Sequence, residues 1–334
     1  MPSPAGPRRF AFVFPGQGSQ SPGMGRDLAD GSAAARDVFG RADEAFAGPL
    51  SALCFDGSEG ALRATHLQQP AIVAVALAAF AATRAALGLP GESMAAAPFP
   101  VPVLAVAGHS VGLCAAMVAA GALALADAIA LVADRGRYMT QAAEQRPGAM
   151  AAVLGLDPDA AGAVVERVRA ATPGSYLAIA NYNAPRQVVV AGDLGSVAAL
   201  GAAALAAGAR RVVPLPVSGA FHSAAMVPAR DAMRARVVAV PLVDPAVPVM
   251  SNVDATPLVA AAQLRAELAD HIAAPVRWLD SVRALGTLGV THVLEFGPGD
   301  VLAGLVRRTL DGITAHSVND LRSAAAAAEV LRHG

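Results

Sequence analysis

The chain has 334 residues, of which 55% are hydrophobic and 15% are charged, and its formal net charge is −1. This composition predicts a folded protein with a sizeable core and argues against a basic surface for nucleic acid. All 25 basic residues are arginine, which excludes Schiff-base and lysine-base chemistry. Only Cys54 and Cys114 occur, so we expect neither a disulfide framework nor a bound metal.

The first part of the chain predicts alternating strands and helices. Phe10 to Phe14 is typical of a short buried strand, and helical patterns then alternate with loops to about Gly88. A Pro- and Ala-rich connection, residues 90–102, precedes the apolar run Val103 to Ala107 and the helical run Leu113 to Ala124. This alternation predicts an α/β core with a mainly parallel sheet.

The middle of the chain changes character. Its predicted elements follow the order β-α-β-β-α-β, at residues 150–154, 157–171, 176–180, 187–191, 194–207 and 211–215. Asn181 to Pro185 supplies the expected hairpin turn between the two central strands. The order predicts a ferredoxin-like unit.

The ferredoxin-like unit is expected to be inserted into a larger domain. We assign residues 147–216 to the small subdomain, and residues 1–146 and 217–334 to the hydrolase-like α/β domain. Val247 to Ser251 and Val293 to Phe296 predict two further strands of the larger core.

Nothing in the sequence predicts a membrane protein. Met1 to Arg9 lacks the apolar stretch of a signal peptide, and the apolar segment Leu113 to Leu125 is shorter than the ~20 residues of a membrane span. We therefore expect a soluble, cytoplasmic protein without membrane contact.

The most informative stretch is Gly108-His109-Ser110-Val111-Gly112. It lies between a predicted strand and a predicted helix, the context of a nucleophile elbow. Glycines on both sides let the backbone turn sharply, and the helix N-terminus favours negative charge near the serine hydroxyl. Ser110 is thus a candidate nucleophile; the alternative is an ordinary strand-to-helix turn.

A nucleophilic serine needs a base within hydrogen-bond reach. His222 is the best candidate, because small neighbouring residues allow close approach to another loop. His109 adjoins Ser110, but adjacent side chains at a tight turn usually point apart. Four histidines occur in no distinctive context: His66, His292, His316 and His333.

Arg135 is a candidate ligand for an anion. With Ile129 and Val132 it falls at near-helical spacing on an apolar face, so it is expected to point inward. A buried guanidinium needs an anionic partner and matches a carboxylate. A structural salt bridge is the alternative for Arg135, whereas Arg137 is expected to be solvated.

Taken together, five segments resemble those of malonyl-CoA:acyl carrier protein transacylases, in the same order and over nearly the whole chain. They are Phe14-Pro15-Gly16-Gln17-Gly18-Ser19-Gln20, the Ser110 elbow, Arg135-Gly136-Arg137-Tyr138-Met139, Ser218-Gly219-Ala220-Phe221-His222-Ser223 and Glu295-Phe296-Gly297-Pro298-Gly299. The resemblance implies a hydrolase-like α/β domain carrying a ferredoxin-like insertion, which agrees with the reading from the residues.

The resemblance also implies a role for each matching residue. Ser110 matches the nucleophile that carries the acyl ester, and His222 matches its general base. Arg135 matches the arginine that pairs with the malonyl carboxylate. Gln17 and Val111 match the positions whose backbone N–H groups form the oxyanion hole.

Other positions bear on selectivity and on departures from the family. Phe221 resembles malonyl-selective members, in which a bulky ring leaves little room for an α-methyl branch. Leu113 stands where members usually have an acidic residue. His271 stands four residues before Pro275-Val276-Arg277-Trp278, where many members have a glutamine that orients the catalytic histidine. A backbone carbonyl of residue 271 can serve that purpose whatever the side chain.

The resemblance implies malonyl transfer from malonyl-CoA to the phosphopantetheine thiol of an acyl carrier protein, through a malonyl-serine. The expected partners are coenzyme A thioesters and a carrier protein, with no permanently bound cofactor, and the chain is expected to be a monomer. Three alternatives stay open: a trans-acting polyketide acyltransferase, an editing acyl hydrolase, and a non-catalytic carrier-protein-binding subunit. Arg135 argues against the hydrolase, and intact Ser110, His222 and Gln17 argue against the non-catalytic subunit.

Overall fold

The computed structural model describes residues 7–217 and 219–333, and two β-sheets form within them. The larger sheet has the strand order β10-β9-β1-β2-β7-β8, and every neighbouring pair is parallel except β7 and β8. Its strands are β1 (Phe10–Phe14), β2 (Val103–Gly108), β7 (Val249–Met250), β8 (Pro257–Leu258), β9 (His292–Phe296) and β10 (Thr314–Val318). The predicted mainly parallel sheet is confirmed; β8 and β10 were not predicted.

The register of the central strands places two loops side by side. Phe14 at the end of β1 pairs with Gly108 at the end of β2. Because the strands are parallel, the loop after Phe14, which contains Gln17, and the turn after Gly108, which contains Ser110, leave the same edge of the sheet.

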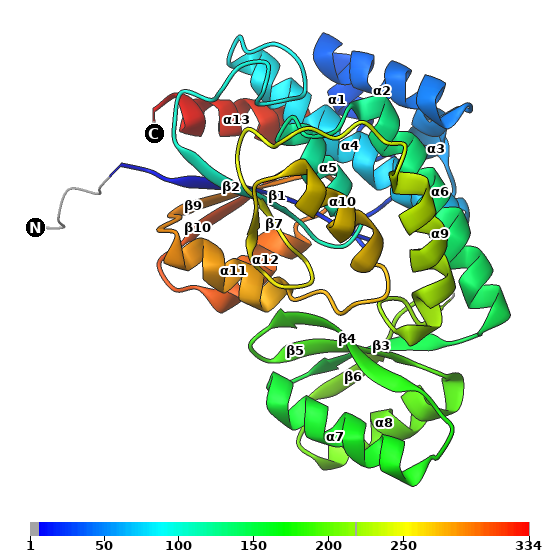
Figure 1. Ribbon diagram of the computed structural model, residues 1–334. Helices are drawn as coiled ribbons and strands as arrows, with labels where there is room; N and C mark the ends of the chain where they lie inside the picture. Colours follow the sequence, from blue (N-terminus) through cyan, green and yellow to red (C-terminus); the bar gives the residue numbers. More distant parts are fainter. Residues whose placement is uncertain (1–6, 218, 334) are drawn as a thin grey trace, which may run out of the picture.

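Helices cover both faces of this sheet (Figure 1). In chain order they are α1 (Arg26–Gly31), α2 (Ala33–Phe46), α3 (Leu50–Asp56), α4 (Thr65–Ala86), α5 (Gly112–Ala119), α6 (Leu125–Gln145), α9 (Val227–Val237), α10 (Ala261–Asp270), α11 (Trp278–Thr287), α12 (Val301–Thr309) and α13 (Leu321–Arg332), with 3-10 turns at Ala61–Arg63 and Ala224–Met226. The predicted helix Leu113 to Ala124 is wrong at its end: α5 stops at Ala119 because Gly121 takes a positive φ of 78°.

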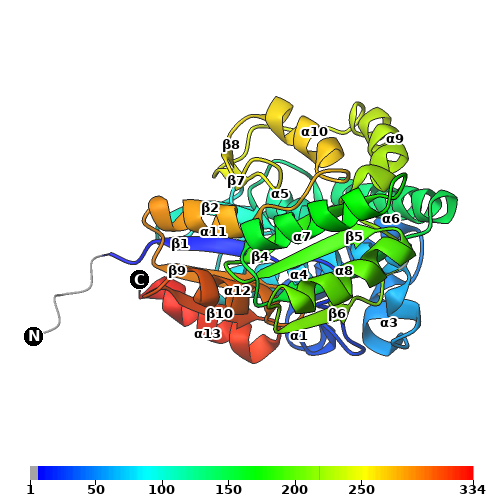
Figure 2. The ribbon, with the colours of Figure 1, turned by 90° about the horizontal axis from the view of Figure 1, so that it is seen from below.

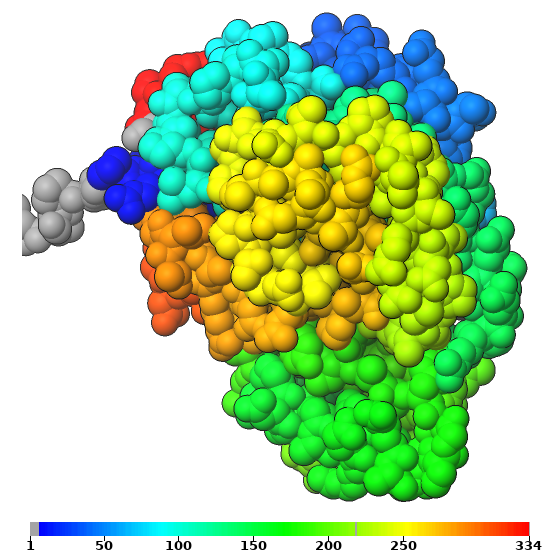
Figure 3. All heavy atoms as spheres, viewed as in Figure 1, coloured from blue at the N-terminus to red at the C-terminus, as the bar shows by residue number. Residues whose placement is uncertain are grey.

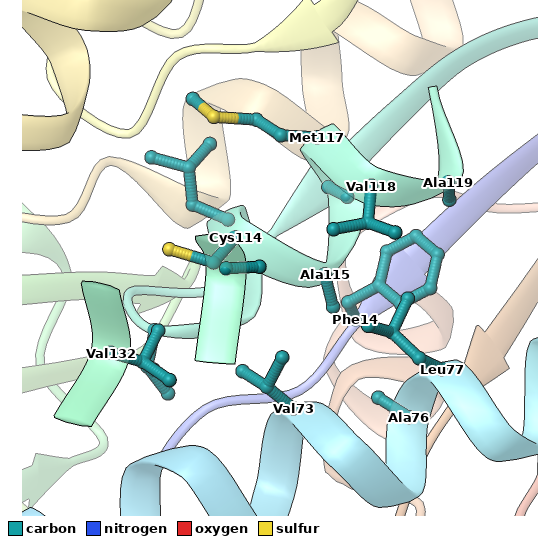
Figure 4. Close-up of a cluster of buried hydrophobic side chains, with 14 of the residues drawn as sticks. Phe14, Val73, Ala76, Leu77, Cys114, Ala115, Met117, Val118, Ala119 and Val132 are labelled. Atoms are coloured by element: carbon teal, nitrogen blue, oxygen red, sulfur yellow. The ribbon is translucent and has the colours of Figure 1, made fainter. Parts of the chain in front are cut away.

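Helix α4 forms the centre of the larger core. Figure 4 shows Val73 and Leu77 of this helix packed against Phe14 of β1 and the side chains of α5. Within the described residues, α4 is the one helix long and apolar enough to cross a membrane by length and composition, although 89% of its apolar window is buried in the protein. It is longer than Leu113 to Leu125, the segment that the sequence analysis singled out.

The small unit has an antiparallel sheet of order β4-β5-β3-β6. Its elements are β3 (Ala149–Leu154), α7 (Pro158–Ala171), β4 (Leu177–Ala184), β5 (Gln187–Gly192), α8 (Leu194–Ala206) and β6 (Arg211–Pro214). This is the predicted ferredoxin-like order. The limits 147–216 stay a prediction.

Strand β4 joins the two units and overturns one predicted turn. Asn181 to Pro185 was expected to be the hairpin turn, yet β4 continues to Ala184. The reason is an inter-unit bridge: the Tyr182 N–H donates to the Val276 carbonyl at 2.9 Å, and the Val276 N–H donates to the Ala180 carbonyl at 2.8 Å. These bonds hold β4 extended where its sequence favours a turn.

The small sheet lies between the large unit and its own two helices (Figures 1 and 2). Met150, Ala180 and Val189 on one face belong to the core of the large unit, and the other face packs against α7 and α8. In the space-filling view the green small unit lies directly against the yellow and orange part of the large unit, with no gap between them (Figure 3). The two units therefore share a packed interface.

We expect Gly112→Ala to lower the free energy of unfolding by about 1–3 kcal/mol, because a Cβ on residue 112 would overlap the Phe14 carbonyl oxygen. Gly40→Ala, at an open position of α2, is the matched control and should raise this free energy by ~0.5–1 kcal/mol. Urea unfolding of both variants measures the two effects. Equal stability of Gly112→Ala and the wild type would show that the turn has room for a side chain.

Candidate active site

Ser110 lies at a strained turn between β2 and α5. Its φ is +52°, a left-handed value that serine rarely adopts. A Cβ on Gly108 would overlap the backbone of Gly112, and a Cβ on Gly112 would overlap the Phe14 carbonyl. The two glycines thus allow the tight approach, and the strain that Ser110 retains is typical of a nucleophile elbow.

His222 faces the Ser110 hydroxyl. Its Nε2 lies 2.7 Å from Ser110 Oγ, and its Nδ1 lies 2.9 Å from the His271 carbonyl oxygen and 3.2 Å from that of Ala274. Because carbonyl oxygens only accept hydrogen bonds, Nδ1 must carry the proton. The Nε2 lone pair then accepts the hydroxyl proton of Ser110, as a general base requires.

His109 points away from the serine. Its Nε2 lies 3.0 Å from Asn183 Oδ1, and its ring packs edge-on against Trp278. Of the two histidines weighed as the base, the structure brings His222 to Ser110. The contact of Asn183 with His109 was not predicted, because the sequence of residues 181–185 predicted a turn there.

A second polar pair, also missed from the sequence, holds the elbow. Asn252 Oδ1 accepts the Ser110 backbone N–H at 2.9 Å, and Asn252 Nδ2 donates to the Gly108 carbonyl at 3.0 Å. The buried Glu267 carboxylate accepts from the Asn252 N–H at 2.6 Å and from Ser251 Oγ at 2.8 Å. Asn252 directly follows the predicted strand Val247 to Ser251, at the sheet edge that carries Ser110. Polar residues at this edge often belong to a site, so the position of Asn252 in the sequence could have marked it as a candidate.

Arg135 projects from α6 and is fully buried beside Ser110. Its Nη2 donates to Ser110 Oγ at 3.1 Å and faces His271 Nε2 at 3.3 Å, while its Nη1 donates to Gln69 Oε1 at 2.6 Å. Every one of these partners is neutral. Arg137, by contrast, pairs with Asp134 on the surface, as expected.

The charge of Arg135 has no carboxylate partner among residues 7–217 and 219–333, and its Nε has no hydrogen-bond acceptor there. Burial lowers the pKa of this guanidinium to about 10, so it stays a cation near neutral pH. The alternative of a structural salt bridge therefore fails for the described residues. An uncompensated buried cation beside a nucleophile is suited to bind an anionic group.

Gln17 lies in the loop after β1, and Val111 directly follows Ser110 in the elbow. The Gln17 side chain donates to Gln68 Oε1 at 2.5 Å, and Val111 is the buried residue before α5. In the part of the chain that the structure describes, neither backbone N–H donates to a protein acceptor. Both amides are therefore free to bind a developing oxyanion.

A cavity of about 120 Å³ opens at Ser110 between the two units. The large unit lines it with Gln17, His109, Ser110, Phe221 and His222, and the small unit with Met150, Asn181, Asn183 and Val189. A neighbouring cavity of about 80 Å³ shares Gln17, His109 and Asn183 and continues along α12. Phe221 therefore lines the site, whereas Leu113 is fully buried in the core. Ser218 lies outside the described residues.

Burial and the Arg135 charge control the proton affinity of the base. Burial first, and Arg135 second, lower the pKa of His222 to about 3, against the smaller opposing effect of its bonds to backbone carbonyls. His222 is therefore neutral across the physiological range. The site combines a neutral His222, a Ser110 whose backbone is strained and the buried Arg135 cation.

Comparison with known proteins assigns the family. The model of the acyl transferase domain matches residues 11–332. The chain is 38% identical over 322 residues to the malonyl CoA-acyl carrier protein transacylase of Escherichia coli O157:H7, covering 96% of this chain and 99% of that one. The chain belongs to the acyl transferase family. The resemblance inferred from the five segments is confirmed, and the protein is an acyltransferase.

Solved structures agree with this assignment. The acyl-carrier-protein S-malonyltransferase of Burkholderia pseudomallei 1710b has a TM-score of 0.87 at 38% identity, covering 96% of this chain and 99% of that one. A malonyl-transacylase in complex with its type II polyketide synthase acyl-carrier protein has a TM-score of 0.88 at 36% identity, with coverage of 96% and 99%. The acyltransferase fold predicted from the sequence is thereby confirmed.

We expect the rate of Ser110 acylation by an uncharged acyl thioester to stay constant from about pH 8 down to about pH 5. The base is active when neutral, and its depressed pKa keeps it neutral over this range. Arg135→Ala removes a charge that lowers the pKa of His222, so the loss of rate at low pH should begin at a higher pH in this variant than in the wild type. Single-turnover rates against pH measure both. A wild-type loss of rate centred near the ordinary histidine pKa of about 6.5 would contradict the buried-base assignment.

Proposed function

We propose that this acyltransferase transfers a malonyl group from malonyl-CoA to the phosphopantetheine thiol of an acyl carrier protein, through a malonyl-Ser110 intermediate. The observation that carries the proposal is the buried Arg135 cation, which has no carboxylate partner in the described residues and lies 3.1 Å from Ser110 Oγ. The similarity to malonyl CoA-acyl carrier protein transacylases supports the same donor and acceptor.

In the first half-reaction Ser110 Oγ attacks the thioester carbonyl carbon while His222 Nε2 takes the hydroxyl proton. The backbone N–H groups of Gln17 and Val111 bind the oxyanion, an effect typically worth ~10²–10³ in rate per donor. The tetrahedral intermediate then collapses: the C–S bond breaks, His222 returns the proton to sulfur, and coenzyme A leaves as the thiol.

The second half-reaction reverses these steps with another thiol. The phosphopantetheine thiol gives its proton to His222 and attacks the ester carbonyl. The C–O bond to Ser110 breaks, and His222 protonates the departing oxygen. The malonyl group then leaves as a thioester of the carrier protein, and Ser110 and His222 regain their starting protonation states.

The chain length of a malonyl group is compatible with the position of Arg135. In a malonyl-serine ester the carboxylate follows the ester oxygen after only two carbon atoms. A guanidinium that already donates to Ser110 Oγ can therefore reach that carboxylate. It can exchange its contact with the neutral hydroxyl for a hydrogen-bonded pair with a carboxylate, in which both partners are charged.

Phe221 is proposed to limit branching at the α-carbon. Its buried ring lines the cavity of about 120 Å³ at Ser110, which leaves little room for a methyl branch. One methyl group is worth only ~1–3 kcal/mol in such a pocket, so selectivity over methylmalonyl is expected to be incomplete.

The residues of the site argue against two of the three alternative functions and are compatible with the third. An editing hydrolase needs no cation for a carboxylate, and a non-catalytic subunit needs no serine 2.7 Å from a histidine base. A trans-acting polyketide acyltransferase uses the same residues, and the similarity to a transacylase bound to a polyketide carrier protein keeps it as the second candidate. The proposal includes a cytoplasmic monomer, with no resident cofactor, acting on a coenzyme A thioester and a carrier protein.

Incubation with malonyl-CoA should leave a malonyl adduct on the wild-type protein, and the adduct should disappear when a carrier protein bearing phosphopantetheine is added. Ser110→Ala should give no adduct, because the described residues offer no second activated nucleophile beside it: burial raises the pKa of the nearby Cys114 thiol to about 11. Intact-mass and peptide mass spectrometry measure this. An adduct on Cys114 would refute the serine mechanism.

Arg135→Ala should change which acyl group is accepted. Its loss leaves the malonyl carboxylate unpaired in a buried site, while an acetyl group suffers no such penalty. The ratio of kcat/KM for malonyl-CoA to that for acetyl-CoA should fall by ~10²-fold or more. Arg137→Ala, at the exposed position two residues along α6, is the control and should keep the ratio. An unchanged ratio in Arg135→Ala would remove the argument for a dicarboxylic donor.

A further inference from the structure

His271, the residue that follows α10, touches two parts of the site through different atoms. Its backbone carbonyl accepts from His222 Nδ1 at 2.9 Å, and its buried ring brings Nε2 to 3.3 Å from Arg135 Nη2. The carbonyl contact orients the base and is independent of the side chain. The ring contact has no part in the mechanism above, and its chemistry depends on which nitrogen carries the proton.

The surroundings decide the tautomer of His271. Its Nδ1 lies 2.7 Å from the Glu267 carbonyl oxygen, which only accepts, so Nδ1 carries the hydrogen. Arg135 Nη2 only donates, so Nε2 must present its lone pair. A doubly protonated ring would direct an N–H at the guanidinium. Burial and the Arg135 charge, in that order, hold the pKa of His271 well below its ordinary value, which agrees with the neutral form.

The guanidinium is thereby fixed at three points. Nη1 donates to Gln69, one hydrogen of Nη2 is directed to Ser110 Oγ, and the other is directed to His271 Nε2. Because the guanidinium is planar, acceptors on both terminal nitrogens set its orientation as well as its position. All three acceptors are neutral, so they orient the cation without cancelling the charge that a substrate carboxylate needs.

We propose that His271 is a positioning residue for Arg135: its Nε2 lone pair holds the guanidinium at Ser110 and so contributes to selection of a carboxylated acyl group. This inference rests on the proposed malonyl transfer. It assigns the ring of His271 to the arginine, and only the backbone carbonyl of His271 to the catalytic histidine.

The inference separates the effects of two substitutions. His271→Leu removes the acceptor, and should lower the malonyl to acetyl ratio of kcat/KM by about tenfold, chiefly through a higher KM for malonyl-CoA. His271→Gln supplies an amide oxygen that can accept from Arg135, and should return the ratio to within about threefold of the wild type. His271→Met, also without a comparable acceptor, replaces His271→Leu if that variant does not fold.

The decisive experiment is a double-mutant cycle with Arg135→Ala, using malonyl-CoA and acetyl-CoA as donors and thermal unfolding to monitor the fold. In the Arg135→Ala background, removal of the His271 ring should change the ratio by less than about twofold. An equal loss with both donors, or the same change of ratio in both backgrounds, would overturn the positioning role. A wild-type protein that does not prefer malonyl-CoA, or a ratio unchanged by Arg135→Ala, would instead overturn the proposed function and this inference with it.

Discussion

The buried charge of Arg135 is the constraint on which the rest of the site depends. A guanidinium enclosed without a carboxylate loses much of its hydration energy, and the protein returns only part of it through neutral acceptors. Burial first, and this charge second, lower the pKa of both His222 and His271, so both rings are neutral. The charge also lies against the Ser110 hydroxyl, where it favours the alkoxide. In the proposed mechanism, the same uncompensated cation helps to keep His222 neutral, lies against the Ser110 hydroxyl and offers a site for an anion.

The end of helix α10 organises the groups around this charge. The Glu267 carboxylate holds the backbone of Asn252, whose side chain holds the elbow at Ser110. Four residues later the His271 carbonyl orients His222, and its ring faces Arg135. One helix end therefore fixes the nucleophile, the base and the cation relative to one another. Such shared support limits relative movement of groups whose geometry must hold within a fraction of an ångström.

The second unit completes the site from the opposite side. Backbone bonds between β4 and Val276 join the small sheet to the segment that precedes α11, and Asn183 of β4 bonds His109 across the interface. Trp278, two residues after Val276, packs against the same histidine. The segment Pro275-Val276-Arg277-Trp278 thus joins the two units and supports the wall of the cavity. The cavity at Ser110 exists because both units contribute side chains to it.

The sequence alone determined those strands and turns that depend on interactions between residues close together in the chain. Apolar runs and turn residues predicted β1, β2 and the order of the small unit, because burial periodicity and glycine conformation act over a few residues. The elbow at Ser110 was predicted because only small flanking residues permit that turn. The residues themselves made His222 a candidate base and Arg135 a candidate anion ligand. The resemblance then gave these two residues specific roles and added Gln17 and Val111.

Only the tertiary structure decided which groups meet. The β4 strand runs through an apparent turn because Val276, almost a hundred residues away, pairs with it. Asn252 and Glu267 are ordinary polar residues in the sequence, and their role in holding the elbow comes from the parallel strands that bring β7 beside β2. The absence of an acid near Arg135 among the described residues, and the tautomer of His271, depend on every group packed around them. These contacts join groups from distant parts of the chain, so no local pattern could have revealed them.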